Sequence, residues 1–155
     1  MGRTIRRVPQ NWEHPKDENG NFIPLYEGSY SEALESWAEG RKQWSRGLQD
    51  DWSRGWKKKN PEYKGMQYFG YAGQRPFKDA YMPEWADEEK TYYQMYEDTT
   101  EGTPISPVMV SPEKLARWLT DTNASFFGDK TTTYEHWFYI CGGSCGLPIF
   151  VTDAK

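Results

Sequence analysis

Apolar side chains recur at helical spacing in one segment of the N-terminal third of the chain. Trp37, Trp44 and Leu48 fall near one face of a helix. Ser29 precedes them as the N-cap of a capping box, with a glutamate three residues further on. Gly40 and Gly47 weaken the helix without removing the pattern. The spacing therefore predicts a helix over about 29–48.

Two further helices are predicted in the C-terminal half. Ser111 is a good N-cap, and Pro112 suits the first helical position because its missing N–H is not needed there. Leu115 and the apolar residues after it share one face, which predicts a helix over about 112–122. A shorter helix is predicted over about 133–141, where a glycine pair ends it.

The pattern between these helices favours an antiparallel hairpin. Residues 92–97 and 105–110 are strand candidates, and a turn-rich stretch separates them. We therefore predict a hairpin over about 92–110 and an α+β fold with long, aromatic-rich loops. Residues 1–28 are rich in turn signals and predict an extended N-terminal arm ahead of a single α+β domain over 29–155.

Aromatic side chains outnumber the aliphatic ones that normally build an interior. The chain has 8 Trp, 11 Tyr and 7 Phe, against only 15 Ile, Leu and Val. Each aromatic ring can bury about 150–250 Å², so rings must supply much of the core, and some are expected at the surface. The sequence has no long apolar run and no apolar signal region at its start. These features, with only two cysteines, lead us to expect a cytoplasmic protein.

Charge is unevenly distributed, and one basic segment is the best candidate for ligand contact. Residues 41–64 hold eight Lys or Arg against three Asp or Glu, with tryptophans between them. We expect the partner contacts in this segment at Trp52, Arg54, Trp56, Lys57, Lys58 and Lys59. The hairpin loop, at Glu101 and Gly102, is a second candidate contact.

Signals for catalysis are weak. Gly142-Gly143-Ser144-Cys145-Gly146 matches a nucleophile-elbow pattern, but no histidine and few residues follow it. Zinc ligands could come from His14, His136, Cys141 and Cys145, although their spacing does not form a paired knuckle. No phosphate-binding glycine loop is present. We predict no catalytic residue, no metal and no cofactor, and keep a small hydrolase or metal enzyme as an alternative.

Several segments together resemble one group of proteins. The chain is similar, over most of the stretch from Arg6 to Trp137, to small uncharacterised proteins encoded by tailed bacteriophages and prophages. The segments that carry the resemblance are 6–9, 74–76, 81–85, 100–108, 111–119, 127–128 and 133–137. The resemblance transfers no catalytic residue, because the group has no established one.

The resemblance implies a phage protein made in the cytoplasm of a bacterial host. Small phage accessory proteins often bind and block host machinery, including defence systems such as CRISPR, so we expect a non-enzymatic inhibitor that acts by protein–protein contact. The alternative is a nucleic-acid or nucleotide binder that uses the basic, Trp-rich segment 41–64. A third hypothesis is that the acidic half of the chain, residues 81–155, imitates the charge of DNA.

Overall fold

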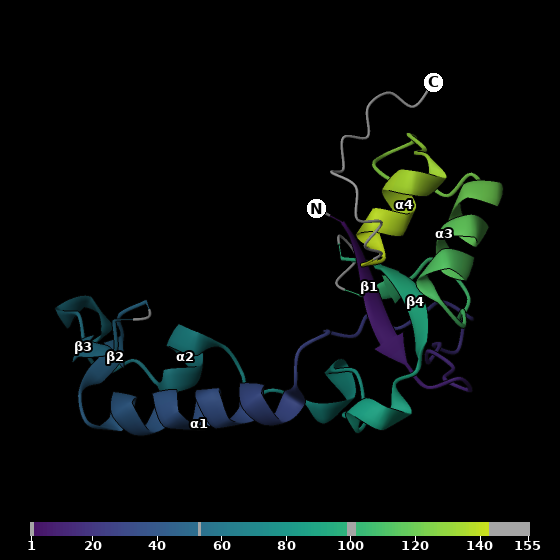
Figure 1. Cartoon of the computed structure of the whole chain (residues 1–155). Coiled ribbons are helices and arrows are strands. Elements are labelled where there is room, and N and C mark those ends of the chain that lie inside the picture. Colours follow the sequence, from purple (N-terminus) through teal and green to yellow (C-terminus); the bar gives the residue numbers. More distant parts are fainter. Residues whose placement is uncertain (1, 53, 99–101, 143–155) are drawn as a thin grey trace. The chain divides into compact units, whose positions relative to one another are not determined.

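The chain folds into two compact units (Figure 1). The computed structural model describes residues 2–52, 54–98 and 102–142. Unit 1 is built from both ends of the chain, up to Glu27 and from Trp85 onward, and unit 2 is Gly28–Glu84. The chain contains both helices and strands, and both sheets are antiparallel, which confirms the predicted α+β class.

A three-stranded antiparallel sheet lies at the centre of unit 1. Its order is β1 (Arg3–Val8), β4 (Tyr92–Glu97) and β5 (Thr103–Pro104). The predicted hairpin is confirmed, because β4 pairs with β5 and an isolated bridge extends the pairing to Met109. β1 pairs with β4 along its whole length, so the predicted arm of residues 1–28 begins as a strand of the sheet.

Two helices supply the hydrophobic core that packs on this sheet. α3 (Pro112–Asp121) and α4 (Tyr134–Ile140) lie side by side in Figure 1, close to the predicted ranges. Their predicted starts hold because Ser111 Oγ accepts the amide of Lys114 at 3.1 Å and Thr133 caps α4 in the same way. The buried cluster consists of Met95, Leu115, Ala116, Leu119, Trp137 and Cys141.

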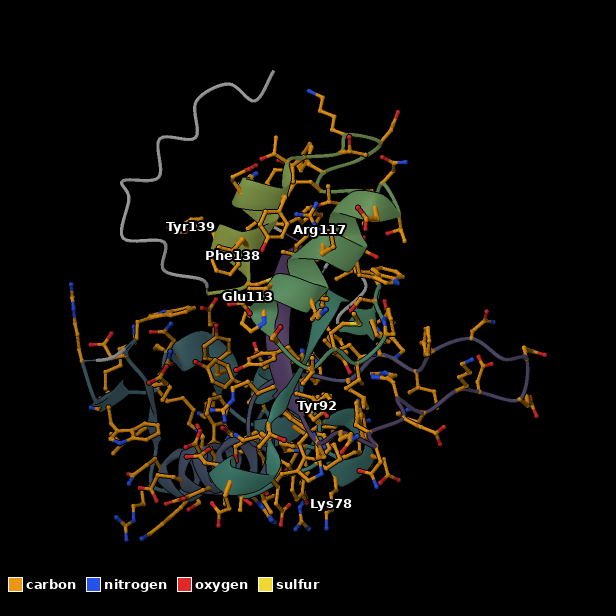
Figure 2. The ribbon with its side chains drawn as sticks, turned by 45° about the vertical axis from the view of Figure 1, so that its right-hand side comes forward. Lys78, Tyr92, Glu113, Arg117, Phe138 and Tyr139 are labelled. Carbon is orange, nitrogen blue, oxygen red and sulfur yellow. The ribbon has the colours of Figure 1, made fainter. Side chains whose placement is uncertain are left out.

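One face of α3 and α4 shows how rings extend the core toward the surface. Figure 2 labels Arg117 on α3 and Phe138 on α4. The guanidinium of Arg117 lies 4.2 Å from the ring centre of Tyr134, and that ring stacks on Phe138 with an interplanar angle of 8°. The stack joins a charged side chain to two rings, which is a contact that helical periodicity alone does not indicate.

A buried polar network fixes the loop that follows β1. His14 Nε2 lies 2.6 Å from the carbonyl oxygen of Ile23, and its Nδ1 lies 2.9 Å from the hydroxyl of Tyr96. A carbonyl oxygen can only accept, so Nε2 carries the hydrogen. The Tyr96 hydroxyl lies between Nδ1 and Gln94 Oε1, to which it donates at 3.1 Å. Trp12 Nε1 donates to that hydroxyl, at 3.1 Å. The guanidinium of Arg6 lies 4.1 Å from the centre of the Tyr96 ring.

Unit 2 is organised around a long helix and a short hairpin. α1 (Tyr30–Ser45) ends three residues before the predicted limit, because Gly47 has φ +84° and Leu48 opens a strand. The hairpin consists of β2 (Leu48–Asp50) and β3 (Trp56–Lys58), and α2 (Tyr68–Ala72) packs against α1. Short 3₁₀ turns at 61–63 and 78–80 complete the unit.

Tryptophan and tyrosine rings form the interior of unit 2. Trp44 is buried and stacks on Tyr71, with ring centres 4.6 Å apart. Its indole N–H donates to the carbonyl of Met66 at 2.9 Å. Trp37 approaches Tyr68 edge-on at 5.3 Å. Rings therefore replace aliphatic side chains in this interior.

The two ends of unit 2 are joined by hydrogen bonds. Ser29, the N-cap of α1, and Ser31 both donate to the carboxylate of Glu84, the latter at 2.7 Å. Both hydrogen bonds lower the pKa of Glu84, and the bond from Ser29 has the larger effect. This division of the chain differs from the predicted one, in which an arm of residues 1–28 preceded one domain over 29–155.

Candidate interaction surface

The predicted contact segment forms the β2–β3 hairpin of unit 2. Asp50 pairs with Trp56 across the two strands. In the turn, the amide of Asp51 donates to the carbonyl of Gly55 at 3.0 Å, and the amide of Arg54 donates to the carbonyl of Asp51 at the same distance. The hairpin therefore brings the predicted residues Trp52, Arg54, Trp56, Lys57 and Lys58 onto one short element.

Both tryptophans of the hairpin present ring surface to solvent. Trp52 is 84% exposed and Trp56 is 41% exposed. Trp52 also has φ +48°, a left-handed conformation that is uncommon for residues other than glycine, asparagine and aspartate. An indole held outward on a conformationally costly residue is a feature that often marks a functional position.

The predicted cationic side chains differ in their exposure and in the groups that they contact. Arg54, Lys57 and Lys58 are exposed. Lys57 forms an ion pair with Asp51, with Nζ and Oδ1 3.6 Å apart. Lys59 Nζ instead lies 4.2 Å from the centre of the Trp44 ring, so this predicted contact residue stabilises the interior of unit 2.

A cleft beside the hairpin, called here the aromatic cleft, joins it to α1 and α2. Its volume is about 590 Å³. Rings and carboxylates dominate its walls, which are formed by Ser36, Glu39, Gly40, Gln49, Asp50, Trp52, Trp56, Tyr68, Tyr71 and Ala72. Trp52 and Trp56 were predicted from the sequence, whereas the α1 and α2 residues were not.

The floor of the aromatic cleft depends on a glycine in α1. A Cβ atom added to Gly40 would lie only 2.0 Å from the hydroxyl oxygen of Tyr68. Glycine therefore lets Tyr68 approach the helix backbone closely. Burial, with smaller contributions from Tyr71 and Asp50, raises the pKa of Tyr68. The phenol stays neutral at physiological pH beside a carboxylate.

A second hollow in unit 2, called here the basic groove, runs along α1. Its volume is about 670 Å³, and three cationic side chains line it: Arg41, Lys42 and Arg75. Trp37 contributes an aromatic wall, and the guanidinium of Arg41 lies 5.9 Å from the centre of that indole. This groove therefore gathers positive charge and one indole along a single hollow of unit 2.

The second predicted contact was the hairpin loop of unit 1, at Glu101 and Gly102. Glu101 lies outside the described residues. Gly102 is buried, with φ +109°, and a Cβ there would lie 1.9 Å from the carbonyl oxygen of Leu25. The amide of Leu25 donates to the carbonyl of Gly102 at 3.1 Å. The structure thus gives Gly102 a backbone-packing role that differs from the predicted contact role.

The candidate zinc ligands do not gather in the described part of the chain. Residues 2–52, 54–98 and 102–142 contain no group of three His, Cys, Asp or Glu side chains arranged to hold a metal ion. His136 Nδ1 lies 2.7 Å from Thr132 Oγ1. Burial raises the pKa of the Cys141 thiol to about 12, so this thiol is a poor nucleophile. Cys145, with the rest of the elbow-like motif from Gly143, lies outside the described residues.

Within the described ranges, no helix is both long enough and apolar enough to span a bilayer. No protein-family model, no curated protein and no solved structure matches the chain. The residues and geometry of unit 2 are therefore the basis for what can be inferred about function.

Proposed function

We propose that the chain is a phage accessory protein, without enzymatic activity, that binds and inhibits a protein of the bacterial host. Its site of action would be the host cytoplasm, and a defence complex such as a CRISPR-type effector is the target class we favour. Two features support the proposal: the resemblance of several segments to small phage proteins, and the exposed tryptophans of the hairpin.

The observation that carries the proposal is the exposure of Trp52. Its indole is 84% exposed at the tip of the hairpin, and Trp56 presents a second ring on the same element. Removing one such ring from water on binding would contribute roughly 4 kcal/mol before the costs of association are subtracted. Tryptophan and arginine are the residues most often found at the energetic centres of interfaces, and Arg54 lies between these two.

The proposal predicts that both indoles are needed to capture the partner. Tagged protein would be used to capture proteins from a bacterial lysate, and the captured partner would then be purified and titrated calorimetrically. Trp52→Ala/Trp56→Ala should weaken the binding of the purified partner by at least about 30-fold, since loss of a central aromatic contact costs about 2 kcal/mol or more. A drop in the partner's own activity on binding would establish inhibition.

A matched control removes exposed rings elsewhere. Phe127 and Tyr139 of unit 1 are 53% and 49% exposed, so Phe127→Ala/Tyr139→Ala removes comparable surface without touching the hairpin. This variant should bind the partner as the native protein does. If the hairpin variant binds with unchanged affinity, the proposed contact surface is wrong.

The basic groove favours a second candidate, a nucleic-acid or nucleotide binder. Arg41, Lys42 and Arg75 could neutralise phosphates, and exposed indoles could stack on bases. This candidate predicts that a short single-stranded oligonucleotide binds and loses affinity steeply between about 50 and 200 mM salt, measured by fluorescence anisotropy. Arg41→Ala/Arg75→Ala should weaken binding and reduce the salt dependence. Absence of binding at the lowest salt concentration would eliminate the candidate.

A further inference from the structure

The aromatic cleft combines two kinds of group that attract the same class of ligand. Asp50 and Glu39 bring carboxylates to it from β2 and α1, and Trp52 and Trp56 bring indole rings from the hairpin. The faces of aromatic rings carry negative electrostatic potential, so rings and carboxylates both favour a cation. Their convergence in one hollow is a property of the fold, since these residues come from separate elements.

The two carboxylates of the cleft have no cationic partner of their own in the described part of the chain. Asp50 and Glu39 are both exposed, and neither lies within ion-pair distance of a Lys or Arg among those residues. Glu39 Oε1 accepts a hydrogen bond from the side-chain Nε2 of Gln43 at 2.8 Å, and because this donor is neutral, the charge of Glu39 stays uncompensated. Lys57, the nearest cation along β3, forms its ion pair with Asp51.

We propose that the aromatic cleft binds an arginine side chain presented by a protein partner. This assignment rests on the proposed function, because it names the group that the hairpin surface recognises. The guanidinium would lie against the indoles of Trp52 and Trp56 and donate hydrogen bonds to the carboxylate of Asp50. The cleft, at about 590 Å³, also has room for backbone on either side of the arginine.

Arginine suits the cleft better than lysine for two reasons. The guanidinium is planar, so it can stack on an indole face while its edge donates hydrogen bonds to a carboxylate. It is also more weakly hydrated than an ammonium group, so it loses less on entering a hollow walled by rings. Asp50 and the indole of Trp56 are paired across the hairpin, which provides an acceptor next to a ring.

The test uses free peptides as probes and the indole N–H signals of the full-length protein as the readout. The probe is the blocked peptide Gly-Gly-Arg-Gly-Gly, and its neutral match has citrulline in place of arginine. Nuclear magnetic resonance titration should shift the Trp52 and Trp56 signals with the arginine peptide and leave them unmoved with the citrulline peptide. Substitution of each tryptophan by phenylalanine assigns its signal.

Charge-removing variants locate the binding group. Asp50→Asn and Glu39→Gln keep the shape of the cleft, and each should weaken the arginine peptide by about fivefold. Glu35→Gln removes the same charge from an exposed position of α1 outside the cleft and should leave affinity unchanged. Equal binding of the citrulline peptide, or an equal loss with Glu35→Gln, would overturn the proposal. Tighter binding of a lysine peptide would overturn the arginine assignment.

This inference and the proposed function can fail separately. If Trp52→Ala/Trp56→Ala abolishes binding of the purified partner while Asp50→Asn and Glu39→Gln do not weaken it, the partner-binding proposal stands and the arginine assignment is wrong. If the arginine peptide binds as expected but the tryptophan variant retains full affinity for the partner, the cleft recognises arginine without being the partner-binding surface.

Discussion

Single residues in this protein hold conformations that ordinary sequence patterns do not favour. Trp52 has φ +48° and an 84% exposed ring. Glycine or asparagine would adopt this backbone conformation at a lower cost in folding free energy. Gly102 shows the opposite case, because only glycine satisfies both its φ of +109° and its contact with Leu25. The first residue is a candidate for function and the second for folding.

His14 provides a prediction about pH at the residue scale. Burial, reinforced by the charge of Arg6, lowers the pKa of His14 below its usual value near 6.5, against the opposing effect of the Ile23 hydrogen bond. The unfolded chain therefore takes up this proton before the folded protein does. The stability due to neutral His14 is complete above about pH 6.5 and decreases as the pH falls below it.

The measurement is a titration of the His14 imidazole by nuclear magnetic resonance, with thermal unfolding followed at about pH 7.5 and about pH 5.5. The pKa should lie below 6.5, and the melting temperature should fall at the lower pH. His14→Gln should reduce this fall. A His14 pKa above 6.5 would contradict the network, because it would mean that the imidazolium is the favoured form.

At the scale of elements, the contact between α1 and α2 depends on a missing side chain. Gly40→Ala should gain up to about 1 kcal/mol of helix propensity but lose more through the collision with the Tyr68 hydroxyl. We expect a net loss of about 1–2 kcal/mol in the free energy of unfolding, measured by denaturant titration. Tyr68→Phe removes the nearest colliding atom and leaves Cζ at 2.8 Å, so Gly40→Ala should cost less in that background without becoming free of cost. A stabilising Gly40→Ala would show that α2 can move away without penalty.

The sequence predicted the elements whose signals are local. Ser29, Ser111 and Thr133 indicated where the three longer helices begin, and the turn before Thr103 indicated the β4–β5 hairpin. The β2–β3 hairpin was missed, because each strand has only three residues, one apolar and two polar, which is too short to show an alternation of polar and apolar positions.

The candidate site was predictable only in part. Trp52 and Trp56 are conspicuous in a basic stretch, and the structure places both on one hairpin. Glu39 and Tyr68 join them only through the packing of α1 and α2, which no local pattern reports. Lys59 was predicted as a contact residue because of its charge. Its position over the Trp44 ring depends on where that indole lies in the folded protein, which the sequence does not indicate.

At the scale of the whole molecule, the shortage of aliphatic residues is met differently in the two units. Unit 1 has a conventional cluster around Met95, Leu115 and Leu119, closed by the fully buried Trp137. Unit 2 relies on Trp44 and the rings that surround it, with much less fully buried surface. A unit held together in this way retains rings near its surface, and this is where the candidate contacts lie.

The hydrogen bonds from Ser29 and Ser31 to Glu84 bring the first and last residues of unit 2 together. A segment whose entry and exit points coincide can be replaced by another of different length without stretching the chain around it. The segment Gly28–Glu84 thus satisfies the geometric condition for replacement by a segment of another length. Such a replacement would change the candidate contact surface in one step and leave the sheet and the two helices of unit 1 unaltered.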